Sequence, residues 1–231
     1  MQADIETQRP EMHDAMRWMV WFSVEGDLRF LSHRNMMNLC QRAAARAGLP
    51  LAFSSGFNPR PKLSLILPRP VGVTSRCEVL TINFDRVVHD TQWAERFDKQ
   101  LPAGAKLLRA EPIPSRCHIW VKSVTYQLPL THQQRQVVLE RIARLKIQAN
   151  LPATTKASEE HEESCNDEVS RDTENLIMDA QVKAGCLTFT LAGNRHAGPA
   201  GPGRVLEALG FTDPSMVISR LVRTNIECEI K

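Results

Sequence analysis

The sequence predicts an α+β protein made of two tandem halves, each with the element order β-α-β-β-α-β. Two observations lead to this fold class. Short segments rich in β-branched and aromatic residues alternate with segments whose apolar residues recur at helical spacing. The same order of elements then occurs a second time along the 231 residues, of which 42% are hydrophobic, enough to form a core.

The first half, residues 16–115, contains six predicted elements. A strand over 16–24 ends at the turn Glu25-Gly26-Asp27. A helix follows, with Ser32 as a suitable N-cap and Gly48 as its C-terminal stop. The remaining elements are strands over 63–67, 77–84 and 106–113 and a short helix over 91–101.

The second half, residues 116–231, repeats this order without visible sequence identity to the first. Its predicted elements are strands over 117–128, 176–182, 186–191 and 216–230, a long helix over 132–147 and a short helix over 204–209. Because βαββαβ is the order of ferredoxin-like folds, we expect two tandem ferredoxin-like halves.

Two polar segments are expected to lie outside the folded halves. Residues 1–15 lack the basic-then-apolar order of a secretory signal and are expected to form a disordered leader. Residues 150–174 are acidic and nearly free of large apolar side chains, which predicts a disordered insertion in the second half. A solvated linker is the simpler interpretation of this insertion; the alternative is a nucleic-acid mimic that occupies a basic surface.

The composition excludes several classes of protein. No apolar run reaches the roughly 18 residues that a membrane-spanning helix requires. The six cysteines are scattered singly, so neither a zinc or iron–sulfur site nor a disulfide framework is indicated. We therefore expect a cytoplasmic protein with reduced thiols, no membrane association, and no metal or cofactor of its own.

The charge is unevenly distributed along the chain. Residues 16–125 contain 16 Lys/Arg and 8 Asp/Glu, a balance of +8, whereas residues 155–174 contain 2 and 8, a balance of -6. A basic N-terminal half favours a polyanionic partner, nucleic acid above all, although arginines also occur on ordinary solvated surfaces.

The first candidate site is Leu28–Asn35, where the chain enters the first predicted helix. Free backbone N–H groups at a helix start attract anions, and Arg29 and Ser32 can lie beside them. His33 has the side chain suited to a general acid or base, but an exposed histidine after a capping serine is the simpler interpretation.

The second candidate site is the loop Ser54–Ser64, SSGFNPRPKLS. Gly56 permits a positive φ, while two prolines stiffen the chain. Rigidity reduces the entropy lost on binding, and two cations beside polar side chains suit a phosphate-bearing ligand. Phe57 can pack or stack. The predicted binding residues here are Ser54, Ser55, Gly56, Phe57, Asn58, Arg60, Lys62 and Ser64.

The third candidate site is the Gly/Pro-rich stretch 193–203, GNRHAGPAGPG, before the helix predicted over 204–209. Its backbone amides can cradle a phosphate, and Arg195 and Arg204 add positive charge. Neither the phosphate-loop pattern nor the dinucleotide fingerprint is present, so a flexible loop is an equal alternative.

Seven short motifs stand out along the chain. They are Leu28-Arg29-Phe30-Leu31-Ser32-His33, Gly56-Phe57-Asn58-Pro59, Pro61-Lys62-Leu63-Ser64, Leu67-Pro68, Pro70-Val71-Gly72-Val73, residues 202–209 (PGRVLEAL) and residues 220–224 (RLVRT). Together they resemble the radical-SAM-linked protein family, a bacterial domain of unknown function. The resemblance covers nearly everything outside the leader and the insertion.

The resemblance implies a partner, since members of that family occur fused to, or encoded beside, a radical S-adenosylmethionine (SAM) protein. They also tend to neighbour genes for an RNase E/G-type nuclease and ribosomal proteins. The sequence contains no CxxxCxxC motif, so the iron–sulfur chemistry is expected to belong to the partner. The chain departs from the family pattern at Asn35, where Asp is expected, and at Arg60, where His is expected, which favours anion binding over catalysis.

These observations predict a non-catalytic RNA- or nucleotide-binding partner of a radical SAM enzyme, with phosphates held by Arg29, His33, Arg60 and Lys62. One alternative is a metal-independent RNA-processing enzyme that uses His33, by analogy with RNA endonucleases built from tandem ferredoxin-like domains. A further alternative is a protein-interaction module that binds no RNA.

Overall fold

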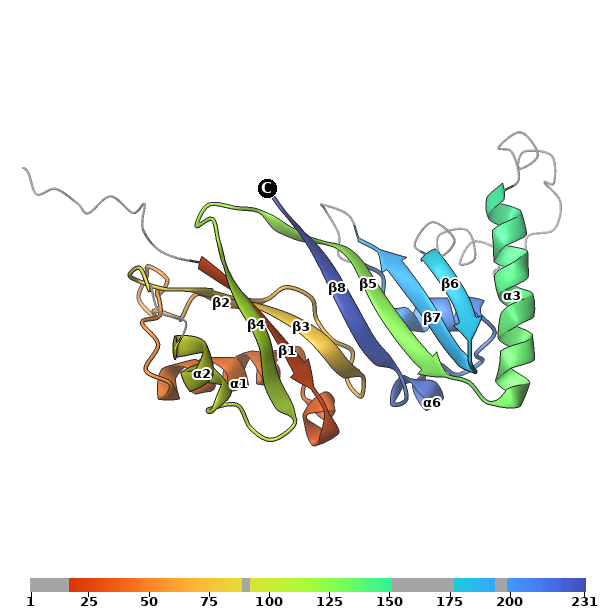
Figure 1. Ribbon diagram of the computed structural model, residues 1–231, viewed down its shortest axis with the longest axis horizontal. Coiled ribbons are helices and arrows are strands. Elements are labelled where there is room, and N and C mark those ends of the chain that lie inside the picture. Colours follow the sequence, from red (N-terminus) through yellow and green to blue (C-terminus); the bar gives the residue numbers. More distant parts are fainter. Residues whose placement is uncertain (1–16, 89–91, 151–176, 194–198) are drawn as a thin grey trace, which may run out of the picture.

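The computed structural model describes residues 17–88, 92–150, 177–193 and 199–231. These residues form a mixed α+β fold in which one eight-stranded sheet runs along the long axis of the molecule (Figure 1). The predicted α+β class is confirmed. The predicted leader and nearly all of the predicted insertion lie outside the described residues, as does Arg195.

The residues of the predicted first half form four strands and three helices. The elements are β1 (Arg17–Val24), the 3₁₀ helix η1 (Gly26–Phe30), α1 (His33–Arg46), β2 (Leu63–Leu65), β3 (Thr74–Asn83), α2 (Gln92–Asp98) and β4 (Ala105–Ile113).

The residues of the predicted second half form the rest of the sheet. The elements are β5 (Ile119–Pro129), α3 (His132–Asn150), β6 (Ile177–Lys183), β7 (Cys186–Ala192), α5 (Pro202–Ala208), α6 (Ser215–Ile218) and β8 (Val222–Ile230). Among the described residues, no helix has the length and apolar character required to span a membrane.

The strands lie in the order β4-β1-β3-β8-β5-β7-β6, with β2 paired to β3 beside this path. All pairings are antiparallel except the one between β3 and β8, which joins Thr74 to Val222 and Ser75 to Arg223 in parallel. Strand β8 therefore connects the strands of the two predicted halves into a continuous sheet.

Apolar side chains on both faces of β1 are buried, which explains its nearly continuous apolar sequence. Trp18, Val20 and Phe22 pack in a core cluster with α1 and α2, whereas Met19 and Trp21 belong to a second cluster that extends under β5, β7 and β8. In the first cluster Trp93 of α2 lies edge-to-face against Trp18, with ring centroids 5.1 Å apart.

The helix α1 ends as its glycine predicts. Gly48 has a φ of +64°, and the N–H groups of Gly48 and Leu49 donate to the carbonyls of Ala45 and Ala44 at 3.0 and 3.1 Å. This is the Schellman arrangement, in which a glycine in the left-handed region allows the last helical carbonyls to be satisfied.

The prediction of one strand over 216–230 is wrong at its start. The structure has the short helix α6 at Ser215–Ile218, and β8 begins only at Val222. Asp213 initiates this turn, because its Oδ1 accepts a hydrogen bond from the N–H of Ser215 at 3.0 Å. Helix α3 also continues beyond its predicted end to Asn150, the first residue assigned to the acidic insertion.

A buried ion pair joins β8 to β3. The side chain of Arg223 is fully buried and donates to both carboxylate oxygens of Glu78, at 3.0 and 3.3 Å. It also donates to the carbonyl of Pro68 at 2.8 Å and to the hydroxyl of Tyr126 at 3.1 Å. Arg223 therefore connects β3, β5, β8 and the segment that leads into β3.

A second buried arginine extends this network towards η1. The Nε of Arg69 lies 4.0 Å from Glu78, and its terminal nitrogens donate to the carbonyls of Leu28, Arg29 and Val73 at 3.2, 2.7 and 2.6 Å. Two buried guanidinium groups thus share one carboxylate, and backbone carbonyls satisfy most of their other donors.

The two arginines experience this environment differently. Burial, opposed by Glu78 and reinforced by Arg223, lowers the pKa of Arg69. Burial also acts against the charge of Arg223, but the closer Glu78 and the Tyr126 hydroxyl outweigh it and raise the pKa of Arg223. Glu78 is therefore the group on which both buried charges depend.

Replacing Glu78 by glutamine should lower the free energy of unfolding by about 3 kcal/mol, because two buried guanidinium groups lose their shared carboxylate. Urea denaturation followed by circular dichroism measures this change. Glu111→Gln is the matched control, since its ion pair with Arg109 is exposed and should contribute less than about 1 kcal/mol. Equal effects of the two substitutions would contradict the central role of Glu78.

Candidate functional site

One long segment of the chain carries cations with almost no acidic residue. Residues 28–84 contain eight Lys/Arg and a single Asp/Glu, which is Glu78. Glu78 is 2% exposed and lies between two buried arginines, so it adds no negative charge to the surface. The exposed cations of this segment are Arg34, Arg42, Arg46, Arg60, Lys62 and Arg76.

The start of α1 is held by Ser32 as predicted. The N–H of Asn35 donates to the Ser32 Oγ at 3.3 Å, and the first helical turn contains no acidic residue. His33 is exposed, and among the described residues no hydrogen bond or ion pair joins its side chain to a neighbour. Ser32 thus has a structural role at this position, and His33 is open to solvent.

Arg29 is fixed through its backbone. Its carbonyl accepts from the N–H of Gly72 at 2.8 Å and from Arg69 at 2.7 Å. Its guanidinium lies over the ring of Phe30, 4.8 Å from the centroid, and its buried Nε has no hydrogen-bond partner within the described part of the chain. These bonds hold η1, which directly precedes α1 in the chain, against the segment over residues 69–72.

The loop over residues 54–62 is a hairpin with a fixed base. Ser54 donates its N–H to the carbonyl of Arg60 at 2.9 Å and accepts the N–H of Arg60 on its Oγ at 3.0 Å. The N–H of Lys62 donates to the carbonyl of Ala52 at 2.7 Å, and Phe53 bridges to Pro61. These bonds hold the base of the loop, so the role of Ser54 in the loop is structural.

The tip of this loop is exposed. Gly56 has a φ of +133°, a conformation that side-chain-bearing residues rarely adopt, which explains the glycine at the turn. In the described part of the chain, no hydrogen bond or ion pair engages the charged groups of Arg60 and Lys62. The exposed residues of the tip are Ser55, Gly56, Phe57, Asn58, Pro59 and Arg60.

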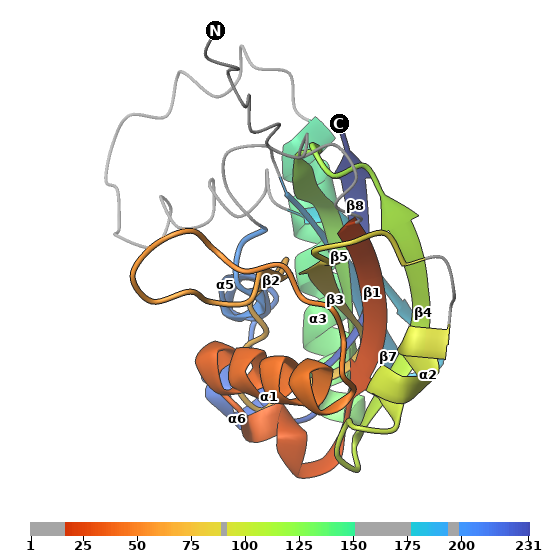
Figure 2. The same cartoon turned by 90° about the vertical axis from the view of Figure 1, so that its left-hand side faces the viewer.

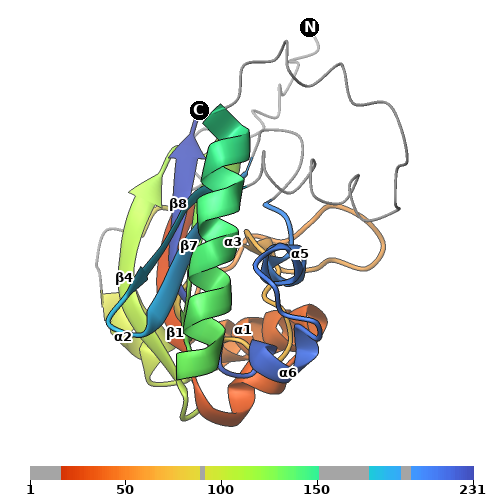
Figure 3. The ribbon, with the colours of Figure 1, turned by 90° about the vertical axis from the view of Figure 1, so that its right-hand side faces the viewer.

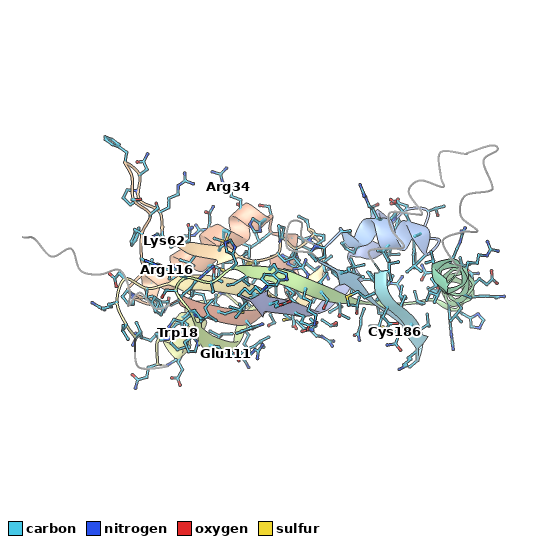
Figure 4. All side chains as sticks on the ribbon, turned by 90° about the horizontal axis from the view of Figure 1, so that it is seen from above. Trp18, Arg34, Lys62, Glu111, Arg116 and Cys186 are labelled. Atoms are coloured by element: carbon cyan, nitrogen blue, oxygen red, sulfur yellow. The ribbon has the colours of Figure 1, made fainter. Side chains whose placement is uncertain are left out.

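The loop and α1 lie on the same side of the sheet, together with α5 and α6 (Figures 2 and 3). Viewed from above, Arg34 and Lys62 are on this side, and Glu111 of β4 is on the other (Figure 4). A hydrogen bond links α1 to β2, the strand that follows the loop, since the N–H of Leu65 donates to the Met37 sulfur at 3.3 Å. The structure thus brings the first and second candidate sites to one side.

The other predicted residues are placed differently. Ser64 lies in β2, exposed, and its carbonyl accepts from the Thr81 hydroxyl at 3.3 Å. Arg204 is exposed on α5, which belongs to the second half of the chain. Arg195 falls outside the described residues, so the third candidate site is represented by Arg204 alone.

Three residues of this side were not predicted from the sequence. Arg34 is exposed beside His33, and Phe30 and Phe53 are 53% and 54% exposed. Aromatic residues are usually buried, so the sequence alone gave no reason to place either phenylalanine at the surface. The scarcity of acidic residues over 28–84 is the signal that could have identified the whole surface.

A hollow of about 320 Å³ lies between β1, β4 and β8. The guanidinium of Arg109 covers the ring of Trp21 there, 3.7 Å from its centroid, and pairs with Glu111 at 2.9 Å. Glu227 also lines this hollow and pairs with Lys122 at 2.8 Å. Because the cation that lines this hollow already has a carboxylate partner and a second carboxylate also lines it, the hollow is poorly suited to an anionic ligand.

No group of three or more His, Cys, Asp or Glu side chains among the described residues is arranged to hold a metal ion. Burial and the nearby Glu78 raise the pKa of the Cys40 thiol to about 12, so this cysteine is protonated at neutral pH. What the described side offers is a rigid, exposed array of cations, which is the chemistry of anion binding.

Comparison with protein-family models matches residues 17–197 to a family described as "Uncharacterized protein conserved in bacteria (DUF2344)". The match covers more than half of the chain and includes η1, α1, the loop over 54–62 and Glu78. A comparison with curated proteins finds no match.

Replacing Ser32 by alanine should lower the free energy of unfolding by about 1 kcal/mol, because the N–H of Asn35 loses its acceptor. Ser32→Asp should preserve stability, since aspartate caps helices about as well as serine. Chemical denaturation measures both. Ser55→Ala, at the exposed tip of the loop, is the control and should change nothing. An alanine variant as stable as the wild type would contradict the capping role.

Proposed function

The chain belongs to the DUF2344 family of uncharacterized proteins conserved in bacteria, and we propose that it is a non-catalytic, cytoplasmic RNA-binding protein. In this proposal the basic side formed by η1, α1 and the loop over 54–62 holds the phosphates of RNA. The protein then presents the bound RNA to a radical SAM enzyme, which supplies the chemistry.

The observation that carries this proposal is the one-sided charge of residues 28–84, whose only carboxylate is buried. Elsewhere in the described chain, exposed cations pair with carboxylates at 2.8 and 2.9 Å. Here Arg34, Arg60 and Lys62 have no such partner among the described residues, so their charges are available to an external anion. A polyanion that contacts several of them also gains from counterion release.

The construction of the loop supports the same function. Its base is fixed by backbone hydrogen bonds and its chain is stiffened by Pro59 and Pro61, so little backbone conformational entropy is lost when Arg60 and Lys62 bind a ligand. Guanidinium and ammonium groups form charge-assisted hydrogen bonds with phosphate oxygens. Phosphate contacts of this kind position a nucleic acid without selecting its sequence.

The radical SAM partner is proposed from the motif resemblance. The chain contains no CxxxCxxC motif, so a partner that carries one would provide the iron–sulfur cluster. The basic side described above would then deliver RNA to the partner's active site.

We also propose that the sheet consists of two ferredoxin-like units. The strand orders β4-β1-β3-β2 and β8-β5-β7-β6 support this, because the first, second, third and fourth strands of each unit take corresponding places. On this view β8 belongs to the second unit and adds to the β3 edge of the first.

A catalytic role for His33 is the competing interpretation. General acid–base catalysis requires a side chain held in place and a complementary group nearby. Within the described residues no side chain bonds to His33. The geometry therefore favours a binding role for this position over a catalytic one.

The double substitution Arg60→Ala and Lys62→Ala should weaken RNA binding and flatten its dependence on salt. If each side chain contacts one phosphate, the slope of log K against log salt should fall by about 1.4 for a single strand. Fluorescence anisotropy of a labelled RNA, titrated at several salt concentrations, measures affinity and slope together.

The matched control is Arg135→Ala with Lys183→Ala, which removes one exposed arginine and one exposed lysine from α3 and β6. This variant should retain the affinity and slope of the wild type. A wild-type protein that fails to bind RNA at low salt would refute the proposal. RNA cleavage that disappears in His33→Ala would favour the catalytic interpretation instead.

The partner is tested by affinity capture of the tagged chain from bacteria that encode it, followed by mass spectrometry. We expect a captured protein that carries a CxxxCxxC motif and whose recovery is reproduced with the two purified proteins. Reconstitution that fails with the purified radical SAM protein would remove this part of the proposal and leave RNA binding unaffected.

A further inference from the structure

The side chain of Phe57 is entirely exposed. Its relative exposure is 103%, so no part of the described protein covers its ring. It lies at the tip of the loop over 54–62, which projects away from the sheet beside α1 (Figure 2). Because no part of its apolar surface is buried within the described chain, the whole ring is available to a ligand.

Phe57 does not hold the loop together. The base is closed by the mutual hydrogen bonds of Ser54 and Arg60 and by the bridge between Phe53 and Pro61. The turn depends on the backbone of Gly56, which has a φ of +133°. The ring of Phe57 can therefore be removed without loss of any contact on which the loop depends.

Among the described residues, the exposed Phe, Trp and Tyr side chains all lie within the basic segment 28–84. Phe30, Phe53 and Phe57 are the aromatic residues classed as exposed in the described part of the chain. Two of them are on the same hairpin as Arg60 and Lys62, and Phe30 lies under the guanidinium of Arg29. Exposed cations and exposed phenylalanine rings thus occur together on the hairpin.

This combination matches the chemistry of an unpaired nucleotide, in which a planar base adjoins a phosphate. Proteins that bind single strands stack bases on aromatic side chains and hold the backbone with nearby cations. The bases of a duplex are already stacked on one another and present only their edges in the grooves. A projecting ring beside cations therefore suits a single strand and gains nothing from a duplex.

We propose that Phe57 is a stacking platform for unpaired bases, with Phe53 as a second platform at the base of the same hairpin. The ligand of the basic side is then single-stranded nucleic acid, held by Arg60 and Lys62 through its phosphates. This inference rests on the proposed function and specifies its substrate class.

The test uses fluorescence anisotropy with a labelled 12-nucleotide oligouridine, the matching oligodeoxythymidine and a blunt 12-base-pair RNA duplex. Phe57→Ala should weaken binding of the single strands by about 5- to 150-fold and leave duplex binding unchanged. Phe57→Tyr, which keeps an aromatic ring, should bind within about twofold of the wild type. Met216→Ala, which truncates a 74% exposed side chain on α6, is the control and should bind normally.

Comparison of oligouridine with oligodeoxythymidine shows whether Phe57 stacks on the bases of any single strand or on those of RNA alone. Equal losses for oligouridine and oligodeoxythymidine support stacking on any unpaired base, whereas a loss confined to RNA supports stacking on RNA with recognition of its 2′-hydroxyl. Circular dichroism and the melting temperature of each variant establish that the fold is intact.

Three outcomes would overturn the inference. The first is a Phe57→Ala variant that binds single strands as well as the wild type while Arg60→Ala with Lys62→Ala does not; the proposed function then stands without stacking. The second is an equal loss for single strands and duplex. The third is a Phe57→Ala variant that retains RNA but no longer associates with phosphatidylserine vesicles, which would assign the ring to a membrane surface. Absence of all nucleic-acid binding by the wild type would instead refute the proposed function.

Discussion

The ion pair between Arg223 and Glu78 is the interaction on which the rest of the structure depends. It joins β8, the central strand of the sheet, to β3 beside the only parallel contact between described strands. Arg69 shares the same carboxylate and uses its remaining donors on the carbonyls of η1. One buried carboxylate thus sets both the alignment of the sheet and the position of the turn that precedes α1. Such a network is costly to desolvate and leaves little tolerance for loss of a partner, so it favours one arrangement of the chain.

The same carboxylate also shapes the surface. Because Glu78 is enclosed between two guanidinium groups, the only acidic residue of the segment 28–84 makes no contribution outside the protein. Arg34, Arg60 and Lys62 have no ion-pair partner among the described residues, and the hairpin with its fixed base carries the last two. The hollow beside Trp21 shows the opposite arrangement, since the cation that lines it, Arg109, is paired with Glu111, and the carboxylate of Glu227 lines it as well. Of these two regions of the described chain, only the basic side has unpaired positive charges that can attract a polyanion.

Much of the fold could be predicted from the sequence because local patterns determine it. The α+β class, the Ser32 cap and the Gly48 stop follow from short-range chemistry, and the structure confirms each of them. The failures have non-local causes. The strand predicted over 216–230 begins late because Asp213 initiates a turn. The apolar pattern of the residues that follow Asp213 gives no indication of this turn. The partnership of Arg223 with Glu78 spans 145 positions, and no spacing rule connects residues so far apart. The exposure of Phe30 and Phe53 was missed for a similar reason, since the sequence shows an apolar side chain but not what surrounds it.

The central position of β8 in the sheet affects when the other strands can find their partners during synthesis. Of the eight strands, β8 is the last to leave the ribosome, yet it lies between β3 and β5 in the middle of the sheet. Until its residues emerge, β3 and β5 each lack a neighbour, and Glu78 has no Arg223 to neutralise it. The sheet therefore becomes continuous only after β8 has been made, and not progressively from the N-terminus. A chain interrupted before β8 would retain unpaired edges on β3 and β5, and unpaired strand edges are prone to aggregation.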